Sequence, residues 1–546
     1  MTSYEMYLVH SLDKVLPDRR PETLREQLVK GFAGETLSLQ LAYTCNNDDF
    51  GESSTLFRVE IDSDIANAVR IRKVELVPCN YPCHGTWDDD YLVTKPGLYP
   101  DLLLPVEPGE YIKAIPSQWR SLWIDVEAEP GIHKVALKIT DGEKQEITTL
   151  DFEVHVLDAK LPKQQLIHTQ WFHADCLADY YQVPVFSEEH WRIIKNFMQS
   201  AVRHSINTIL TPIFTPPLDT AKGGERTTIQ LVKIYRDNGK YRFDFSLLGR
   251  WTDLCEACGI QYLEMAHLFT QWGAICAPKI LVSIDGAEES KLFGWHTSAT
   301  SQEYTDFLHC FIPELKDFLA QRGWLERTFF HISDEPHDHE VETYAAARAS
   351  VRDLLADCKV IDALSSYSIY QKGLVERPVV SVDQIHPFIE AEAPHLWAYY
   401  CTVQAIDVPN RFISMPSTRN RIIGTLLYYY NIEGFLHWGF NFYNSQRSVK
   451  HIDPYRITDA GEAFPSGDPF LVYPAPDGTA CDSIRGMVLR QALYDLRALN
   501  YLEGKIGREG VMELLDDLSK GALTFTHYPR EKTFFETLRR AVYDKI

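Results

Sequence analysis

The sequence predicts a multidomain protein in which an N-terminal β-sandwich is followed by a (β/α)8 barrel of the TIM type and by C-terminal helices. The chain has 546 residues, more than the roughly 250 to 300 at which a single hydrophobic core stops growing. Its first part contains short strands in which apolar and polar residues alternate, which is typical of antiparallel sheets. Its second part alternates short apolar strands with longer helical segments, which is typical of a parallel sheet.

Residues 1–158 form the predicted sandwich domain. Gly, Pro, Asn and Asp separate its strands at the spacing expected of a sandwich. A last strand at residues 146–157 is followed by Pro162, which favours a domain boundary because proline interrupts regular structure. Earlier strands are expected at residues 37–43, 57–61, 121–126 and 134–139.

Residues 164–480 form the predicted barrel. An open doubly wound sheet is the alternative, but no Gly-x-Gly-x-x-Gly follows the first strand and no phosphate-binding Gly-rich loop occurs, so we expect no nucleotide cofactor. The eight expected strands are residues 166–171, 208–210, 262–267, 329–332, 360–363, 379–385, 397–401 and 434–438. The main helices between them are expected at residues 188–204, 246–258, 302–322, 340–355 and 417–430.

Residues 481–546 form the predicted C-terminal helical region. Helical spacing of apolar residues places helices at residues 484–502 and 510–518, and we expect them to pack on the barrel.

Charge and composition exclude several function classes. The formal net charge is -22, with 76 acidic and 54 basic residues, which repels a phosphate backbone and argues against nucleic acid as a partner. The N-terminus lacks a basic region followed by an apolar run, and no stretch approaches membrane-spanning length. We therefore expect a cytoplasmic protein without membrane insertion. The 11 scattered cysteines fit a reducing compartment, and the Cys255–Cys258 pair is better explained by helix packing than by zinc.

An apolar run at residues 328–332 ends in Asp334, Glu335 and Pro336. In a barrel, the end of a strand is where catalytic side chains lie. Successive strand residues face opposite ways, so both carboxylates reach one pocket only if the backbone departs from regular pleating, which Pro336 favours. The alternative is a helix start, where acidic residues precede a first-turn proline.

Aromatic and polar residues gather at the predicted ends of other strands. Flat aromatic faces beside amides and hydroxyls suit a sugar, whose C–H face stacks while its hydroxyls form hydrogen bonds. Each aromatic taken alone is better explained as core. The candidate binding residues are Trp171, His173, Asn207, His267, Tyr399, Trp438, Asn441 and Tyr443.

Two other reaction classes were tested against the same residues. A serine hydrolase needs a nucleophile in a Gly-x-Ser-x-Gly setting, and the sequence has none. His331, His337 and His339 with Asp338 can be interpreted as metal ligands, but their spacing matches no helical His-Glu-x-x-His pattern. We therefore expect no metal, although the metal-dependent hydrolase stays an alternative.

Three segments together resemble glycoside hydrolase family 123 and its relatives, the β-N-acetylgalactosaminidase-like proteins. They are Ser333-Asp334-Glu335-Pro336, residues 434–444 and residues 96–103. The resemblance extends from the sandwich to near residue 500, and it implies the same pairing of a β-sandwich with a catalytic barrel.

The resemblance implies a retaining exo-β-N-acetylgalactosaminidase that acts on non-reducing terminal β-GalNAc of an oligosaccharide or glycoconjugate and needs no cofactor. The substrate's own 2-acetamido group is then the nucleophile. Glu335 is the implied general acid and base, and Asp334 orients the acetamide. Their pKa values must differ, raised at the acid and ordinary or depressed at the stabiliser. Tyr399 is expected to bond the acetamide carbonyl, Trp438 to stack on the sugar, and Asn441 and Tyr443 to hold hydroxyls.

Several alternatives stay open at this stage. No motif determines the contact to an axial O4, so β-GlcNAc specificity is the nearest alternative. A carbohydrate-binding protein without turnover is another. The sandwich can support the barrel, bind glycans or mediate a homodimer.

Overall fold

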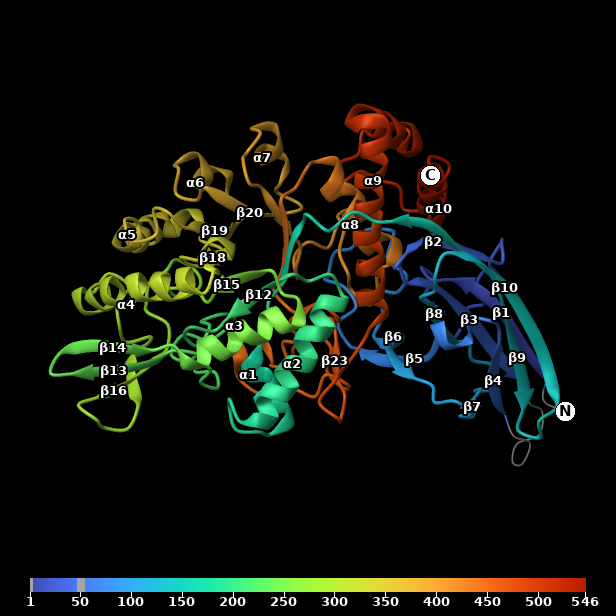
Figure 1. The fold of residues 1–546 in the computed structure, drawn as a ribbon, viewed down its shortest axis with the longest axis horizontal. Coiled ribbons are helices and arrows are strands. Elements are labelled where there is room, and N and C mark those ends of the chain that lie inside the picture. Colours follow the sequence, from blue (N-terminus) through green and yellow to red (C-terminus); the bar gives the residue numbers. More distant parts are fainter. Residues whose placement is uncertain (1–2, 47–54) are drawn as a thin grey trace.

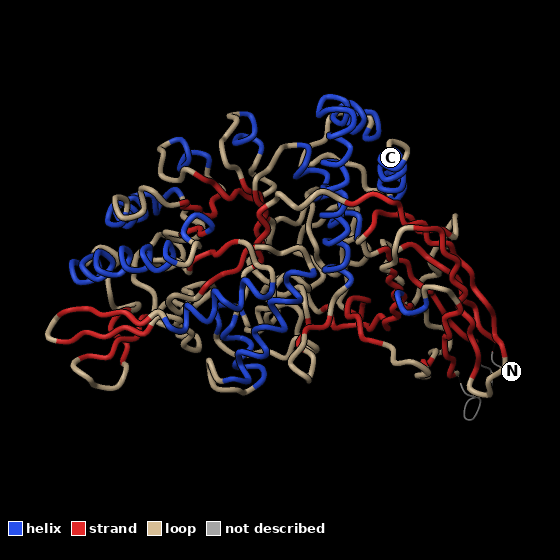
Figure 2. Tube along the Cα trace, viewed as in Figure 1, coloured by secondary structure: helices blue, strands red, loops and turns tan. Residues whose placement is uncertain are grey.

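The computed structural model describes residues 3–46 and 55–546. Two β-sheets lie on the right in Figure 1, a barrel of parallel strands lies at the centre, and helix α9 (Ile484–Ser519) runs between them. Figure 2 shows the barrel strands in red with helices in blue along their outer side. The protein is therefore multidomain, as expected. Within the described ranges, no helix has both the length and the apolar character that a membrane span requires.

The sandwich consists of two five-stranded sheets that share one apolar core. Leu41 and Ile124 of one sheet and Leu137 and Val154 of the other are fully buried in that core. The first sheet has the order β1 (Ser3–His10), β3 (Leu37–Asn46), β8 (Arg120–Val126), β5 (Val69–Cys79) and β6 (Gly97–Pro105). The second has the order β2 (Leu28–Ala33), β10 (Glu146–Lys160), β9 (Gly131–Asp141), β4 (Leu56–Asp62) and β7 (Ile112–Lys113).

Eight parallel strands close into a barrel, because the last strand pairs with the first. Each strand corresponds to one expected from the sequence, with shifted ends. They are β11 (Ile167–Gln170), β12 (Thr208–Thr211), β15 (Tyr262–Met265), β18 (Thr328–Phe330), β19 (Lys359–Leu364), β20 (Arg377–Ser381), β21 (Trp397–Tyr399) and β22 (Gly434–His437).

The helices around the barrel are less regular than a (β/α)8 fold predicts, so this part of the expectation is only partly met. Helices α6 and α7 have five residues each. The helices in chain order are α1 (Ala174–Tyr181), α2 (Glu188–Arg203), α3 (Ser246–Cys258), α4 (Gln302–Gln321), α5 (Val341–Val351), α6 (Tyr367–Gln371), α7 (His386–Glu390) and α8 (Ser417–Tyr429).

A four-stranded sheet, which the sequence analysis did not predict, projects from the barrel at the left of Figure 1. It is built from the segments that follow β12 and β15, in the order β14 (Lys240–Asp244), β13 (Lys233–Asp237), β16 (Ile280–Ile284) and β17 (Ser290–Phe293). The turn Asn238-Gly239 joins β13 to β14, and Asn-Gly between two alternating runs is a hairpin signal that could have revealed them.

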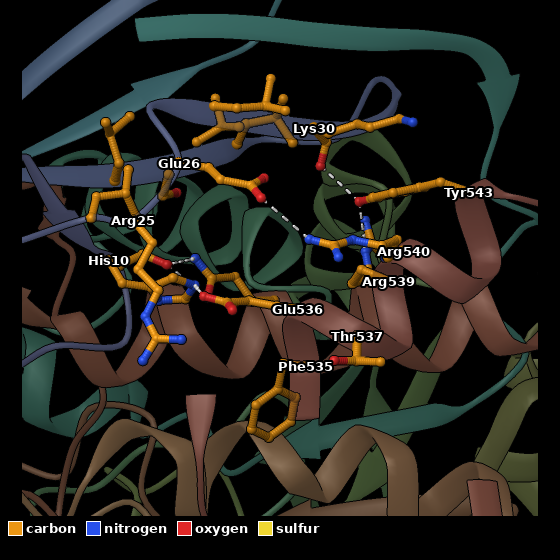
Figure 3. A pocket seen from close by; sticks show the side chains of 18 of the residues that line it. His10, Arg25, Glu26, Lys30, Phe535, Glu536, Thr537, Arg539, Arg540 and Tyr543 are labelled. Carbon is orange, nitrogen blue, oxygen red and sulfur yellow. Dashed lines mark hydrogen bonds and ion pairs between the residues drawn. The ribbon is translucent and has the colours of Figure 1, made fainter. Parts of the chain in front are cut away.

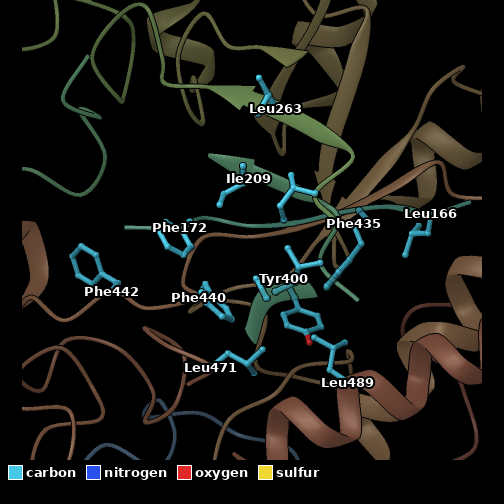
Figure 4. Packing of buried hydrophobic residues seen from close by; sticks show 14 of the residues in the cluster. Leu166, Phe172, Ile209, Leu263, Tyr400, Phe435, Phe440, Phe442, Leu471 and Leu489 are labelled. Carbon is cyan, nitrogen blue, oxygen red and sulfur yellow. The ribbon is translucent and has the colours of Figure 1, made fainter. Parts of the chain in front are cut away.

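Apolar packing positions the barrel strands against α9. Figure 4 shows Ile209, Leu263 and Phe435 from the barrel in one cluster with Leu489 of α9. Inside the barrel the packing is tight enough to require glycine at the start of β22. A Cβ atom at Gly434 would lie 2.1 Å from the indole of Trp397, which is fully buried.

The C-terminal helices connect the barrel to the sandwich. Helix α9 consists of two helical segments that meet at a kink at Gly507, whose dihedral angles are non-helical and which lies within the expected break. Helix α10 (Lys532–Tyr543) was not expected. Buried Arg485 of α9 donates two hydrogen bonds of 2.9 Å to Asp101 of β6. Arg539 of α10 pairs with Glu35 beside a cavity of about 580 Å³ (Figure 3). Charged contacts therefore join the two halves of the molecule.

Candidate active site

Asp334 and Glu335 follow strand β18 and both line a pocket of about 210 Å³. Asp334 is 3% exposed, whereas Glu335 is half-buried. Glu335 has a φ of 45°, and its N–H donates to the carbonyl of Ala363 on β19 at 3.1 Å. The predicted departure from regular pleating is therefore confirmed. The helix-start alternative is wrong, because the helical residues begin only at Asp338.

The pocket lies at the carboxyl ends of the barrel strands, because its lining residues end or follow those strands. Four of the eight candidate binding residues line it together with the carboxylate pair: Trp171, His173, Tyr399 and Trp438. The other lining residues are Leu218, Asp219, Gln271, Trp272, Ala363, Cys401, Thr402, Leu436, Gln446, Arg447 and Phe464.

Glu335 accepts a hydrogen bond from Tyr399. The phenol oxygen lies 2.5 Å from Glu335 Oε1 and 3.3 Å from the hydroxyl of Ser365. Burial and the nearby charge of Glu335 raise the pKa of Tyr399 well above its usual value, so the phenol stays protonated and donates. In this structure the Tyr399 hydroxyl therefore donates to the Glu335 carboxylate, and its contact with an acetamide carbonyl stays a prediction.

Asp334 is a buried residue of the pocket lining. Its Oδ2 accepts a hydrogen bond of 2.6 Å from Gln271 Nε2, and its backbone carbonyl accepts one of 3.2 Å from the Trp272 N–H. Burial raises the pKa of Asp334 well above the usual range of an aspartate, and the charge of Glu335 adds to this. We expected an ordinary or depressed pKa at this residue, so that expectation is wrong for this structure.

A buried cluster of charges lies next to Asp334. His331 Nε2 lies 2.7 Å from Glu264 Oε1 and its Nδ1 lies 3.2 Å from Asp362 Oδ1. Burial opposes protonation, but the hydrogen bonds to Asp362 and Glu264 raise the pKa of His331 to about 9. Glu264 Oε1 also accepts from the indole N–H of Trp171 at 2.8 Å, which holds that pocket wall.

His173 supports the wall that contains Trp438. Burial, and then the neighbouring Arg226, lower the pKa of His173 to about 3, so the ring is neutral. Arg226 donates to Nδ1 at 3.1 Å, which leaves the proton on Nε2 to be donated to the Trp438 carbonyl at 2.9 Å. The indole N–H of Trp438 in turn donates to Asp468 at 2.7 Å. The orientation of this wall is therefore set by hydrogen bonds.

Asn441 and Tyr443 do not line the pocket. The amide of Asn441 bonds the backbone of His173 at 2.9 and 3.0 Å, and the hydroxyl of Tyr443 donates to the Val472 carbonyl at 2.9 Å. Both side chains are buried. The structure therefore assigns them to the support of the strand-eight segment and not to the pocket surface.

Asn207 and His267 also lie away from the pocket. Asn207 precedes β12, at the opposite end of the barrel, and its amide bonds the backbone of residues 166 and 168. His267 stacks on His331 with ring centroids 4.1 Å apart, and its ring nitrogens have no hydrogen-bond partner within the described ranges. Proximity to a strand end in the sequence was not sufficient to select pocket residues, because it does not determine whether a side chain points into the pocket.

The sequence analysis missed Gln271, Asp219 and Arg447 in the pocket and Glu264 and Asp362 behind it. One signal was available for the last two, because each is an acidic residue inside an otherwise apolar predicted strand. Such residues are rarely buried without a partner. The other three stand on loops, where the sequence carries no comparable signal.

The sandwich contacts one wall of the pocket through the loop between β5 and β6. His84 Nε2 lies 2.6 Å from the carbonyl of Thr402, which is a lining residue, and the hydroxyl of Tyr91 donates to the Ala405 carbonyl at 3.0 Å. The N-terminal sheets therefore support the segment that follows β21.

The histidines of the metal alternative do not converge. Both ring nitrogens of His331 contact carboxylates, whereas His337 and His339 are exposed and stack on each other at 5.7 Å. Within residues 3–46 and 55–546, no group of three or more His, Cys, Asp or Glu side chains is arranged to hold a metal ion.

Comparisons with known proteins agree on one family. The model of the glycoside hydrolase 123 catalytic domain matches residues 171–502. A family 123 glycoside hydrolase from Clostridium perfringens, studied for glycolipid glycan hydrolysis, has a similar structure: the TM-score is 0.74 at 15% identity, covering 99% of this chain and 97% of that one.

Other solved structures are much less similar. An FMN-binding β-glucuronidase from Facaelibacterium prausnitzii has a TM-score of 0.29 at 10% identity, and the alignment covers 86% of this chain and 60% of the glucuronidase chain. A putative β-galactosidase from Bacteroides fragilis has a TM-score of 0.31 at 10% identity, and the alignment covers 87% of this chain and 60% of the galactosidase chain. No curated protein sequence matches the chain. The family model alone covers more than half of the residues, and the chain therefore belongs to glycoside hydrolase family 123 and is a glycoside hydrolase.

Proposed function

We propose that this glycoside hydrolase is a retaining exo-β-N-acetylgalactosaminidase in which the 2-acetamido group of the substrate is the nucleophile. One observation carries the proposal: the positive φ of Glu335 turns two consecutive carboxylates into the same pocket. Glycosidases that use two protein carboxylates place them on either side of the scissile bond, whereas substrate-assisted enzymes are exceptions to this arrangement. Adjacent carboxylates on one strand end suit the second class.

Glu335 is the proposed general acid and base. Tyr399 donates to Oε1, so the proton for the leaving oxygen is carried by Oε2. Glu335 gives this proton to the glycosidic oxygen while the acetamide oxygen attacks C1 and the C1–O bond breaks, which forms an oxazolinium ion. The resulting carboxylate then takes a proton from water, which attacks C1 and restores the acetamide.

Asp334 is the proposed stabiliser of the acetamide. Its Oδ2 is occupied by Gln271, which leaves Oδ1 to accept the acetamide N–H. As the acetamide oxygen attacks, positive charge develops on this group, and an ionised Asp334 next to it lowers the free energy of the transition state. The hydrogen bond from Gln271 also favours the ionised form of Asp334.

The shape of the site supports cleavage of a terminal sugar. The pocket is small, and Trp171 and Trp438 supply aromatic surface next to the carboxylates. Preference for GalNAc over GlcNAc, the domain limits given above, a homodimer and a cytoplasmic location stay predictions.

Hydrolysis of paired aryl β-glycosides tests the proposal. N-acetylgalactosaminide, N-acetylglucosaminide, galactoside and glucoside are compared for the wild type, Glu335→Gln and the control Glu342→Gln, an exposed carboxylate of α5. We expect cleavage only of 2-acetamido substrates, with loss in Glu335→Gln and no change in Glu342→Gln. Cleavage of sugars that lack the acetamido group would overturn the mechanism, and binding without cleavage would favour a carbohydrate-binding protein.

A further inference from the structure

The carboxylate of Asp219 lines the same pocket but has no part in the proposed reaction. It stands on the loop after β12 and is half-buried. Its Oδ2 accepts the backbone N–H of Arg447 at 2.9 Å, and its backbone carbonyl accepts from the hydroxyl of Ser448 at 2.8 Å. Within the described ranges no other hydrogen-bond donor reaches this carboxylate, so Oδ1 retains its capacity to accept.

A single amide connects Asp219 to the catalytic pair. Gln271 Oε1 accepts the Asp219 N–H at 2.7 Å, while Gln271 Nε2 donates to Asp334 Oδ2 at 2.6 Å. The two aspartates therefore stand on one side of the pocket, separated by the width of an amide and two hydrogen bonds. A sugar whose acetamido group contacted Asp334 would have Asp219 on the same side of the pocket.

The local backbone is built to hold this geometry. Asp219 (φ 37°), Trp272 (57°), Glu335 (45°) and Arg447 (57°) all have positive φ, and all four line the pocket. Such angles are unfavourable for residues other than glycine, and they persist where the surroundings impose them. Here the Ala221 N–H also donates to the Arg447 carbonyl at 3.0 Å, which ties the two loops together.

We propose that Asp219 accepts hydrogen bonds from ring hydroxyls of the terminal sugar on the side remote from the anomeric carbon, and thereby selects which 2-acetamido sugar is hydrolysed. This inference rests on the proposed function. A carboxylate that accepts from a hydroxyl forms a charge-assisted hydrogen bond, and sites built to bond a hydroxyl reject analogues that lack it.

The role of Asp219 is tested by combining its substitution with the removal of single hydroxyl groups from the substrate. The kcat/KM of wild type and Asp219→Ala is measured on the aryl 2-acetamido glycoside that the wild type cleaves and on its 3-, 4- and 6-deoxy analogues. We expect Asp219→Ala to lose about 10- to 100-fold on the parent. On at least one deoxy analogue the loss should fall to a few fold, because the hydroxyl that contacted Asp219 is already absent.

Two further variants serve as controls for misfolding and for the loss of a carboxylate elsewhere. Asp219→Asn keeps an oxygen for the Arg447 N–H, so it should fold like the wild type and still show the coupling. Asp237→Asn changes an exposed carboxylate on the neighbouring hairpin and should change nothing. Equal rates for Asp219→Ala and the wild type, or equal losses on all four substrates, would overturn the inference.

Failure of the proposed function has a different signature. If the wild type cleaves no 2-acetamido glycoside, the reaction is wrong, and the role of Asp219 is then tested by binding of N-acetylgalactosamine to Glu335→Gln protein with and without Asp219→Ala. At least tenfold weaker binding in the double variant supports the contact. Equal binding rejects it.

Discussion

Replacing His331 by asparagine removes the only cation from a fully buried cluster with Glu264 and Asp362. All three side chains are 0% exposed. The folded-state pKa of His331 is about 9 against 6.5 for a free histidine, and each unit of difference corresponds to about 1.4 kcal/mol. The charged form therefore contributes on the order of 3 kcal/mol, which agrees with the roughly 3 to 5 kcal/mol lost when one partner of a buried pair is removed.

The pH dependence of this contribution has a definite sign. Because the folded pKa lies above the unfolded one, the stabilisation is complete below pH 6.5 and is lost as the pH rises through about 9. Urea unfolding followed by tryptophan fluorescence is measured for wild type, His331→Asn and the exposed control His339→Asn. The free-energy gap between wild type and His331→Asn should be about 3 kcal/mol at pH 6 and should shrink as the pH rises from 6.5 to about 9. A gap that does not change with pH would refute the charged-histidine argument.

Three further predictions concern the reaction and the packing. Asp334→Asn should lower kcat/KM about 10²- to 10³-fold. The kcat/KM of the wild type should rise with pH as Asp334 ionises, and this rise should occur at a higher pH than for an ordinary carboxyl group because the pKa of Asp334 is raised. Asp334→Asn should lack this rise. Tyr399→Phe should lower kcat about tenfold in steady-state assays, because the variant loses the hydrogen bond to Glu335; an unchanged kcat would remove the tyrosine from the mechanism. Gly434→Ala should lower the free energy of unfolding by about 1 to 3 kcal/mol through overpacking in the barrel. The control Gly504→Ala should not lower it, because Gly504 of α9 has open space around it. Equal urea midpoints for the two variants would contradict this prediction.

The position of the carboxylate pair Asp334 and Glu335 in the pocket could be predicted because its signals are local. A strand of apolar residues, two carboxylates and a proline stand next to one another in the chain, and the strand ends of a parallel barrel meet at one face. The same reasoning selected Trp171, His173, Tyr399 and Trp438, which line the pocket.

The rest of the pocket depends on contacts between distant segments. Asp219 and Arg447 meet although 228 positions separate them, and no local pattern in either loop indicates this. The raised pKa of Asp334 also depends on the fold, because the burial that is its main cause arises only in the folded chain. The contact of α10 with the sandwich likewise joins residues 504 positions apart.

The sequence by itself determined that a β-rich first part precedes eight barrel strands and that Asp334 and Glu335 follow the fourth of them. Alternation of apolar and polar residues and turn chemistry are short-range properties, so they can be interpreted without knowledge of the partners. Only the tertiary structure decided which polar side chains face the pocket and which support its walls. Asn441, beside Trp438 in the chain, holds the backbone of His173, because which side chains face a pocket depends on packing between distant segments.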